Sequence, residues 1–292
     1  MSDVNGAKPT FLTVPEPARG LERVRLAVPD PLVDTVVGAR VWRKRRKPDV
    51  VAAARLEMDF LLSEVSTPAE IDAVTQRYLA RETYRSELRY HPKIIGEQPV
   101  DGVDRLRAAR RAGRGVVISF LHHGHYEGAT ASVGKAEAPI HIAISEDMIG
   151  ADAPAFLRQH VRVGLRSGNT GVNAAAGAGV LAKVLTDGHV MAIATDVPGR
   201  TPLHFLGRDR LGSSGAARLA RGTNSLVVVM TAHCDSDGAL SLSIGEPIEP
   251  LDFASHDELL AELLRAQEPA ILAWPEGYHL PRLRWGMPPT DG

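Results

Sequence analysis

The chain has 292 residues, of which 44% are hydrophobic and 24% are charged, and its formal net charge at pH 7 is -1. This composition is typical of a globular protein with a substantial core, and the balanced charge gives no general attraction to nucleic acid. The only cysteine, Cys234, excludes an intramolecular disulfide and a cysteine-based metal cluster, which favours a reducing cytosol. The first residues lack the pattern of a signal peptide, and no apolar run approaches the ~18 residues that span a bilayer.

The first third of the chain is predicted to be helical. Residues 1–30 hold several prolines without periodicity and are expected to form a loosely ordered leader. Apolar residues recur at helical spacing after Pro48, and Thr67 with Glu70 forms the capping pattern that begins a second helix. The predicted organisation is a leader followed by one domain, 31–292, with a helical part, 31–113, and a sheet-containing part, 114–292.

A cluster of cations surrounds Trp42 within the helical part. Its members are Arg40, Arg43, Lys44, Arg45, Arg46 and Lys47. The ordinary interpretation is a solvated helix end, because long charged side chains usually face water. The alternative is peripheral contact with an anionic membrane surface, which a tryptophan among cations also favours.

From Gly115 onward, apolar runs alternate with helical segments, which predicts an α/β fold with a mostly parallel central sheet flanked by helices. The expected strands are 116–121, 140–145, 189–195, 203–206, 225–233 and 240–244. The expected helices are 152–164, 175–187, 214–221 and one through residues 259–264 that Ser255 and Glu258 cap.

The densest group of chemically active side chains follows the first of these strands. His122, His123, His125 and Glu127 come directly after the apolar run, and Gly128 leads into a probable helix. Because ligands bind at the carboxyl ends of strands in open α/β sheets, this segment is the expected site. Gly124 lies within it and is expected, with His123 and His125, to contact substrate.

Three interpretations of this segment remain open. In the first, His122 is a general base and Glu127, five residues on, orients its ring. In the second, His123, His125 and Glu127 are ligands of a zinc-dependent hydrolase, although Gly128 stands where a further histidine is expected. In the third, the imidazoles only bond backbone, and the protein is a ligand-binding module with a degenerate site.

Further candidates lie downstream. Asp196 follows the strand 189–195 and is expected at the same sheet edge as His122. There it would assist His122 in catalysis or contact a polar substrate; the alternative is that it only caps the turn ending in Pro198 and Gly199. Fixed positive charge on Arg200, Arg208 and Arg210 and free amides near Gly215, at a helix start, are expected to contact substrate or an oxyanion.

Several ordered segments resemble the lysophospholipid acyltransferase superfamily, in particular the branch of lipid A late acyltransferases and phosphatidylinositol mannoside acyltransferases. The resemblance spans residues 40–287 and begins with the H-x4-E spacing from His122 to Glu127. It continues through GHVMAIATD at 188–196, FLGR at 205–208, GAARLA at 215–220 and residues 224–230. It ends in a segment rich in Trp and Arg, from Trp274 to Trp285.

The resemblance implies an acyltransferase that uses an acyl thioester, either acyl-CoA or acyl-carrier protein, as co-substrate and needs no other cofactor. His122 would be the base, Glu127 its partner, and the acceptor a hydroxyl or amine. Residues 145–150 lack the basic pattern of the family, so a lysolipid, a glycolipid and a small metabolite all remain possible acceptors. A double histidine followed by x3-E-G also occurs in condensation-type acyltransferases, in which His123 would be the base. The expected location is cytoplasmic, with possible contact at the inner membrane face.

Overall fold

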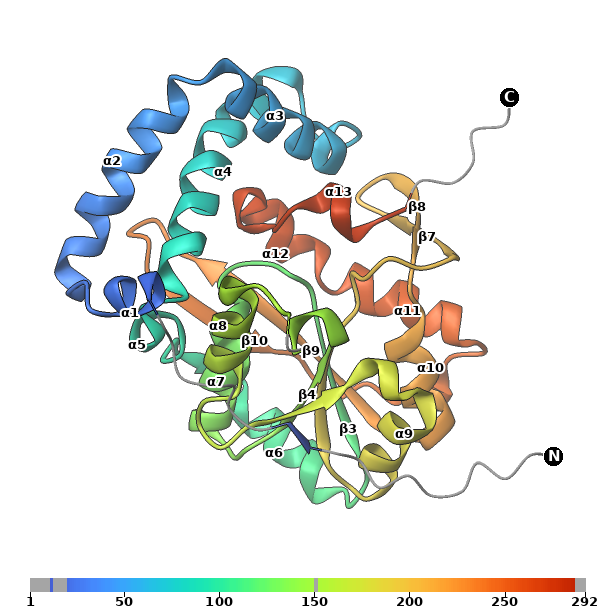
Figure 1. Cartoon of the computed structure of the whole chain (residues 1–292). Helices are drawn as coiled ribbons and strands as arrows, with labels where there is room; N and C mark the ends of the chain where they lie inside the picture. The colour runs from blue at the N-terminus through green and yellow to red at the C-terminus, as the bar shows by residue number, and fades with distance from the viewer. Residues whose placement is uncertain (1–10, 13–19, 150–151, 287–292) are drawn as a thin grey trace.

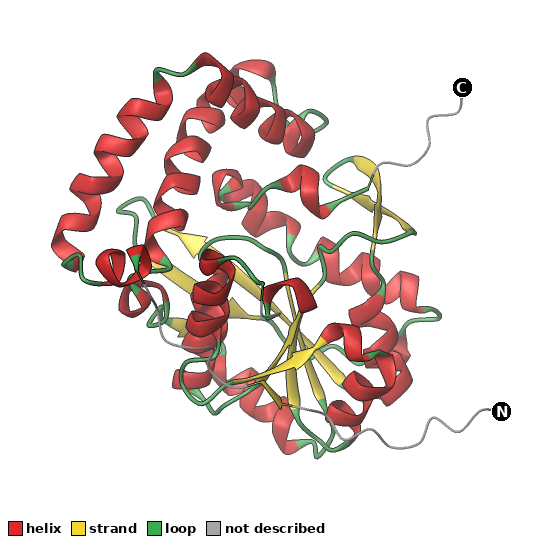
Figure 2. Ribbon diagram, viewed as in Figure 1, coloured by secondary structure: helices red, strands yellow, loops and turns green. Residues whose placement is uncertain are grey.

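The structure of the chain is a computed structural model that describes residues 11–12, 20–149 and 152–286 (Figure 1). Helices lie on both faces of a central, mostly parallel sheet, which confirms the predicted α/β class (Figure 2). Most of the predicted leader, residues 1–10 and 13–19, lies outside the described residues. The rest of it includes β1 (Phe11–Leu12) and α1 (Leu21–Leu26).

The central sheet has eight strands in the order β1-β5-β4-β6-β3-β9-β10-β2. The strands from β5 to β9 in this order run parallel to one another, whereas β1 and β10 are antiparallel to their neighbours β5 and β9. Their bounds are β2 (Val100–Asp101), β3 (Val116–Phe120), β4 (His141–Ile144), β5 (Thr170–Asn173), β6 (Val190–Ala194), β9 (Leu226–Cys234) and β10 (Leu240–Ile244). Five of the six predicted strands are therefore present in this sheet.

The sixth predicted strand, 203–206, lies outside it. It belongs to β7 (Thr201–Phe205), which pairs only with β8 (Arg208–Gly212) in a separate antiparallel hairpin. Leu206 and Gly207 both have positive φ, 51° and 74°, the conformation that a two-residue hairpin turn requires. Strand β5 was not predicted, because only Val172 is apolar in its four residues.

Two sets of helices cover the two faces of the sheet, and a third set, within residues 33–88, forms the N-terminal part of the chain. Their bounds are α2 (Val33–Arg45), α3 (Pro48–Leu62), α4 (Pro68–Leu88), α5 (Pro92–Ile95), α6 (Val103–Arg111), α7 (Tyr126–Ala136), α8 (Ala155–Gly164), α9 (Ala178–Thr186), α10 (Gly215–Thr223), α11 (His256–Arg265), α12 (Glu268–Ala273) and α13 (Pro281–Arg284). Within the described ranges, none of these helices is long and apolar enough to cross a membrane.

Strand β3 is the centre of the core, since all five of its residues are buried. Val117 packs in one apolar cluster with residues of α9, α10 and α11, and Ile118 packs in a second cluster with residues of α6 and α7. Burying an aliphatic side chain of this size contributes about 1.5–3 kcal/mol. The two covered faces explain why the strand is a continuous apolar run rather than an alternating one.

The helical N-terminal third is confirmed, with α2, α3 and α4 packed on one another (Figure 1). The predicted start of α4 is confirmed too: the Thr67 hydroxyl accepts a bond from the Glu70 amide, and the Thr67 amide donates to Glu70 Oε2 at 2.7 Å. Met58 and Tyr78 are buried between these helices. The long α4 thereby reaches the residues that follow β3, which places its arginines at the candidate site.

Candidate active site

The loop after β3 is held in place by a segment near the C-terminus. Its contacts with that segment are a β-bridge between His123 and Tyr278, a bond from the Gly124 amide to the Gly277 carbonyl at 2.9 Å, and a bond from the His279 amide to the His122 carbonyl at 2.8 Å. The backbone that presents His122 therefore has fixed partners far away in the sequence.

Gly124 has a structural role in this loop. Its φ is +67°, and a Cβ at this position would lie 2.5 Å from the Cβ of Ala232. Glycine is the residue that adopts such a backbone conformation without steric cost. The backbone geometry accounts for a glycine at this position, and the predicted substrate contact of Gly124 stays a prediction.

His122 and Asp196 form the central pair of the site. Strands β3 and β6 are parallel neighbours, so residues that follow them meet at one sheet edge, as predicted. His122 Nδ1 lies 2.7 Å from Asp196 Oδ1, and the His122 amide donates to Asp196 Oδ2 at 2.8 Å. The Tyr278 hydroxyl donates to the same Oδ2 at 2.8 Å. Asp196 therefore accepts three hydrogen bonds while fully buried.

The charge states of this pair follow from its surroundings. Burial alone would raise the pKa of Asp196, but His122, its hydrogen bonds and Arg284 together lower that pKa below its ordinary value. Burial also lowers the pKa of His122; Asp196 opposes this shift and Arg284 adds to it. Near neutral pH the pair is thus an ionised carboxylate and a neutral imidazole whose Nδ1–H donates to that carboxylate. This tautomer leaves Nε2 as a proton acceptor.

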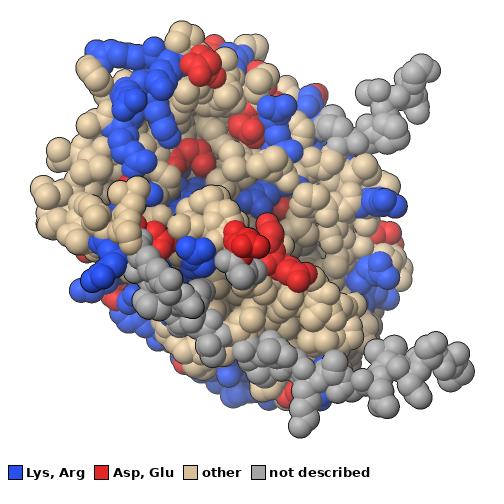
Figure 3. All heavy atoms as spheres, in the orientation of Figure 1, with Lys and Arg blue, Asp and Glu red and all other residues tan. Residues whose placement is uncertain are grey.

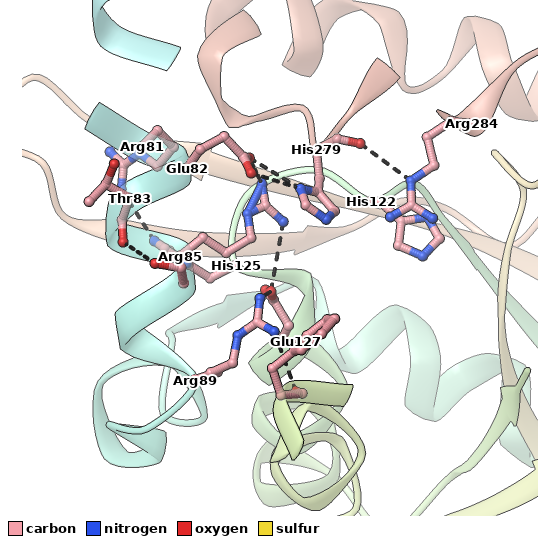
Figure 4. Close-up of polar contacts among 12 residues, drawn as sticks. Arg81, Glu82, Thr83, Arg85, Arg89, His122, His125, Glu127, His279 and Arg284 are labelled. Atoms are coloured by element: carbon pink, nitrogen blue, oxygen red, sulfur yellow. Dashed lines mark hydrogen bonds and ion pairs between the residues drawn. The ribbon is translucent and has the colours of Figure 1, made fainter. Parts of the chain in front are cut away.

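Glu127 does not contact the ring of His122 in the way that the H-x4-E spacing predicts. It is 1% exposed and lies between two arginines of the α4 region, with Oε1 3.7 Å from Arg85 Nη1 and 3.6 Å from Arg89 Nη2 (Figure 4). Burial would raise the pKa of Glu127, but Arg85, His160 and Arg89 lower it to about 2. The carboxylate that orients His122 in the structure is Asp196, and Glu127 instead balances the charge of buried arginines.

His123 and His125 point to different partners. His123 Nε2–H donates to the Trp274 carbonyl at 2.8 Å, and Arg81 Nη1 lies 3.2 Å from His125 Nε2. Burial lowers the pKa of His123 to about 4 and that of His125 to about 3. Over the described part of the chain, no three side chains of His, Cys, Asp or Glu are grouped so as to hold a metal ion. The alternating zinc ligands of the second interpretation are thus not brought together.

A cavity of about 70 Å³ adjoins His122. Its polar lining comes from His122, Tyr126, Glu127, Thr130 and His160, and the rest is apolar: Phe120, Ile142, Ala143, Ile144, Met148, Val161, Gly164 and Ala194. His122 Nε2 has no hydrogen-bond partner among the described residues. A proton-accepting nitrogen at the wall of a small, mainly apolar cavity suits a reaction on a substrate that carries a hydrocarbon chain.

Two of the predicted substrate contacts anchor the β7–β8 hairpin instead. Arg208 Nη2 lies 2.6 Å from Glu64 Oε1 and donates to the Ser63 hydroxyl at 2.7 Å. Arg210 is 1% exposed, donates to the Phe60 carbonyl and stacks over the Phe60 ring. Both guanidinium groups therefore fasten the hairpin to the end of α3, a use that the isolated sequence pattern does not reveal.

Arg200 and Gly215 lie at a different hollow from His122. They line an open pocket of about 620 Å³ together with Ser213 and Arg218, and this pocket shares no residue with the cavity beside His122. The Gly215 amide donates to the Ser213 hydroxyl at 3.2 Å, so it is not a free donor for an oxyanion. The structure thus separates these two predicted contacts from the candidate base.

The site also contains residues that no local motif indicates. Arg85 and Arg89 come from the α4 region, His160 from α8, and His279 and Arg284 from the C-terminal segment, as Figure 4 shows for the four of them that it labels. Of these five residues, His279 and Arg284 lie in the segment rich in Trp and Arg, from Trp274 to Trp285, that carries the end of the family resemblance. The one available signal is the concentration of arginines on one face of α4, at positions that an ordinary surface helix would also use.

The structure is thus an α/β fold with a paired histidine and aspartate, His122 and Asp196, at the carboxyl edge of its parallel strands. No protein-family model matches the chain, and no curated protein matches its sequence. Among solved structures, the chain is similar to the 1-acyl-sn-glycerophosphate acyltransferase of Thermotoga maritima, with 14% sequence identity and a TM-score of 0.40. The similar region covers 79% of this chain and 97% of that one.

Proposed function

We propose that the chain is an acyltransferase that moves an acyl group from a thioester, acyl-CoA or acyl-carrier protein, to a hydroxyl or amine acceptor. The observation that carries this proposal is the 2.7 Å contact of His122 Nδ1 with the buried Asp196, which leaves Nε2 as a base beside an apolar cavity. A neutral imidazole held in this way is suited to remove a proton from an acceptor. Apart from the thioester, the reaction needs no cofactor.

His122 transfers the proton in this reaction, and the groups that contact its ring hold and stabilise it. Nε2 takes the proton of the acceptor hydroxyl or amine while the acceptor attacks the thioester carbonyl, and the imidazolium so formed is stabilised by Asp196. When the tetrahedral intermediate collapses, the carbon–sulfur bond breaks and Nε2–H returns its proton to the leaving thiolate. His122 is then neutral again and ready for another acceptor.

Asp196 and Glu127 have different roles in this proposal. Asp196 is the orienting acid, because it contacts Nδ1 and the amide of His122. Glu127 keeps a catalytic contribution as the counter-charge that lets Arg85 and Arg89 stay buried close to the base. His123 and His125 hold the loop through Trp274 and Arg81, so their substrate contacts are indirect.

The substrate classes follow from the cavity. Its mainly apolar lining suits the acyl chain of the donor, and the acceptor has to reach Nε2 of His122 at the wall of this cavity. Lysolipids and glycolipids at the inner face of the membrane, and small cytoplasmic metabolites, are the acceptor classes to compare. Nucleic acid is not among the proposed partners, since the formal charge of the chain is -1.

Thiol release tests this proposal directly. Purified protein mixed with acyl-CoA or acyl-carrier protein is expected to liberate the free thiol in proportion to added acceptor, and the acylated acceptor should appear by mass spectrometry. Metal analysis of the same sample distinguishes the acyltransferase from a zinc-dependent hydrolase. Stoichiometric zinc, together with thioester consumption that ignores every acceptor, would exclude the transferase.

The basic end of α2 is the part of the surface proposed to touch a membrane. Figure 3 shows Lys and Arg side chains gathered over α2. Arg40 pairs with Glu87 and Lys44 donates to Thr83 at 3.0 Å, so these two face α4. The remaining cations of the cluster are exposed, and Trp42 is 62% exposed with the Arg46 guanidinium stacked 3.2 Å from its ring centroid.

Binding to anionic vesicles is therefore expected at low salt and should weaken as salt rises. Each exposed cation near such a surface contributes about 1 kcal/mol, and salt screens that attraction. Cosedimentation with phosphatidylserine vesicles measures it, with Trp42→Ala and Arg46→Gln expected to bind less well. Arg265→Gln, on the distant α11, is the matched control. Absence of binding by the unmodified protein at every salt concentration would remove the membrane contact.

A further inference from the structure

Arg284 lies in the C-terminal segment, and its side chain points toward His122 (Figure 4). It ends α13, and its Nε donates to the His279 carbonyl at 3.3 Å. The amide of the same His279 donates to the His122 carbonyl at 2.8 Å. The backbone of one residue, His279, thus contacts both the side chain of Arg284 and the carbonyl of His122, which holds Arg284 next to the loop that presents His122.

The two terminal nitrogens of Arg284 have no hydrogen-bond or ion-pair partner among the described residues. Among the described residues, Arg284 forms no ion pair with a carboxylate, and its only hydrogen bond uses Nε. This differs from Arg85, which pairs with Glu82 and Glu127, and from Arg208, which pairs with Glu64. An arginine kept beside a reactive site with two free donors is available to a negative group that arises there.

The positive charge of Arg284 shifts the pKa of several groups in the site. It lowers the pKa of His122 and of Asp196, and it lowers that of His160 and His279 as well. In each case burial is the largest influence, and Arg284 is one of several charges that act with or against it. This agrees with the place of the guanidinium beside His122 in Figure 4, although Arg284 is not part of the wall of the apolar cavity.

We propose that Arg284 is a catalytic residue whose terminal nitrogens stabilise the oxyanion that forms on the thioester carbonyl. This inference rests on the proposed acyl transfer. As the acceptor oxygen or nitrogen bonds to the carbonyl carbon, the carbonyl π electrons move to oxygen, and the acceptor proton moves to His122 Nε2. Collapse returns the electrons to the carbonyl, breaks the carbon–sulfur bond and passes the proton from Nε2 to the thiolate sulfur.

The position of Arg284 favours the carbonyl over the rest of the donor. With the acyl chain in the cavity, its carbonyl would lie at the end next to His122, and Arg284 lies beside His122 without lining that cavity (Figure 4). A fixed hydrogen-bond donor accelerates a reaction most when it stabilises charge that exists only in the intermediate. Removing one such donor costs about 10²- to 10³-fold in kcat.

Variants of Arg284 test this role against Arg282, which lies on the same helix and is exposed. Arg284→Gln is expected to lower kcat by about 10²- to 10³-fold with little change in KM for donor or acceptor. Arg284→Lys should retain part of the activity, and added guanidinium ion should restore part of that lost in Arg284→Ala. Arg282→Gln should behave like the unmodified protein. A raised acceptor KM with unchanged kcat would overturn the proposal, because it would make Arg284 an acceptor anchor.

A second measurement does not depend on turnover. The groups that face His122 are Asp196 after β6, Arg85 from α4, Tyr126 and Glu127 from α7, His160 from α8, and His279 and Arg284 near the C-terminus. Loss of the Arg284 charge should raise the pKa of His122 in an NMR titration and shift the acid limb of kcat/KM to higher pH. An unchanged His122 titration in a folded Arg284→Gln protein would contradict the proposal. If the unmodified protein transfers no acyl group, the proposed function fails instead, independently of this titration.

Discussion

Replacing His122 by alanine is expected to lower turnover by about 10²- to 10⁴-fold, the usual contribution of a positioned general base. Without Nε2, the acceptor has to attack while still protonated, whereas the cavity and Arg284 remain. The fold should persist, because the ring is partly open to the cavity and its largest contact is with one carboxylate. Thiol release under saturating donor and acceptor measures the effect, and circular dichroism checks the fold.

His204→Ala is the matched control for this variant. His204 lies on the β7–β8 hairpin and is exposed, with its Nδ1 2.9 Å from Asp209. It should retain full activity. If a folded His122→Ala protein kept near-normal turnover while His123→Ala lost it, the base would be His123, as in condensation-type acyltransferases.

The sequence was most informative about the sheet edge. Val116 to Leu121 had to be a strand buried on both faces, and parallel neighbours bring the residues after two such strands together. That argument predicts that Asp196 lies beside His122, and the 2.7 Å contact between them bears it out. The signal is strong because it depends on the order of strands rather than on side-chain direction.

The spacing of His122 and Glu127 was less informative. A histidine and a carboxylate five residues apart, at a strand-to-helix junction, fit either a mutual contact or separate partners. The partners that decide this, Arg85 and Arg89, lie some forty residues upstream in the sequence, on a helix whose packing no local pattern specifies. Two buried cations nearby attract the carboxylate of Glu127 more strongly than a neutral imidazole does.

The arginines of the β7–β8 hairpin show a different limit of prediction from sequence. The pattern Arg208-Asp-Arg210 beside a glycine-rich helix start is compatible with an anion site. Whether a guanidinium contacts substrate or holds the scaffold depends on what packs against it. Here α3 supplies the Phe60 carbonyl, and the turn that follows α3 supplies Glu64. Because α3 is about 150 residues away in sequence, that outcome is a matter of tertiary structure.

Replacing Arg85 by methionine is expected to lower the free energy of unfolding by about 3–5 kcal/mol, the usual effect of removing one partner of a buried ion pair. Arg85 is 1% exposed and is the partner of both Glu82 and Glu127. Without it, Glu127 is left as a buried charge that only Arg89 faces at close range. Urea unfolding at pH 7 measures the change. Arg107→Met, which breaks an exposed pair with Glu137, should cost at most about 1 kcal/mol.

The pH dependence of the free energy of unfolding distinguishes the loss of charge pairing from a simple loss of packing. Glu127 has a folded-state pKa of about 2, below its ordinary value of 4.5, so its contribution to stability is present above pH 4.5 and is lost as the pH falls toward 2. In Arg85→Met the pKa of Glu127 should rise, and stability should no longer fall in that window through this group. Adding Glu127→Met to Arg85→Met should recover much of the lost stability, since both charges are then gone. If the double variant is as unstable as the sum of the two single ones, packing rather than charge pairing explains why Arg85 is buried next to the candidate base.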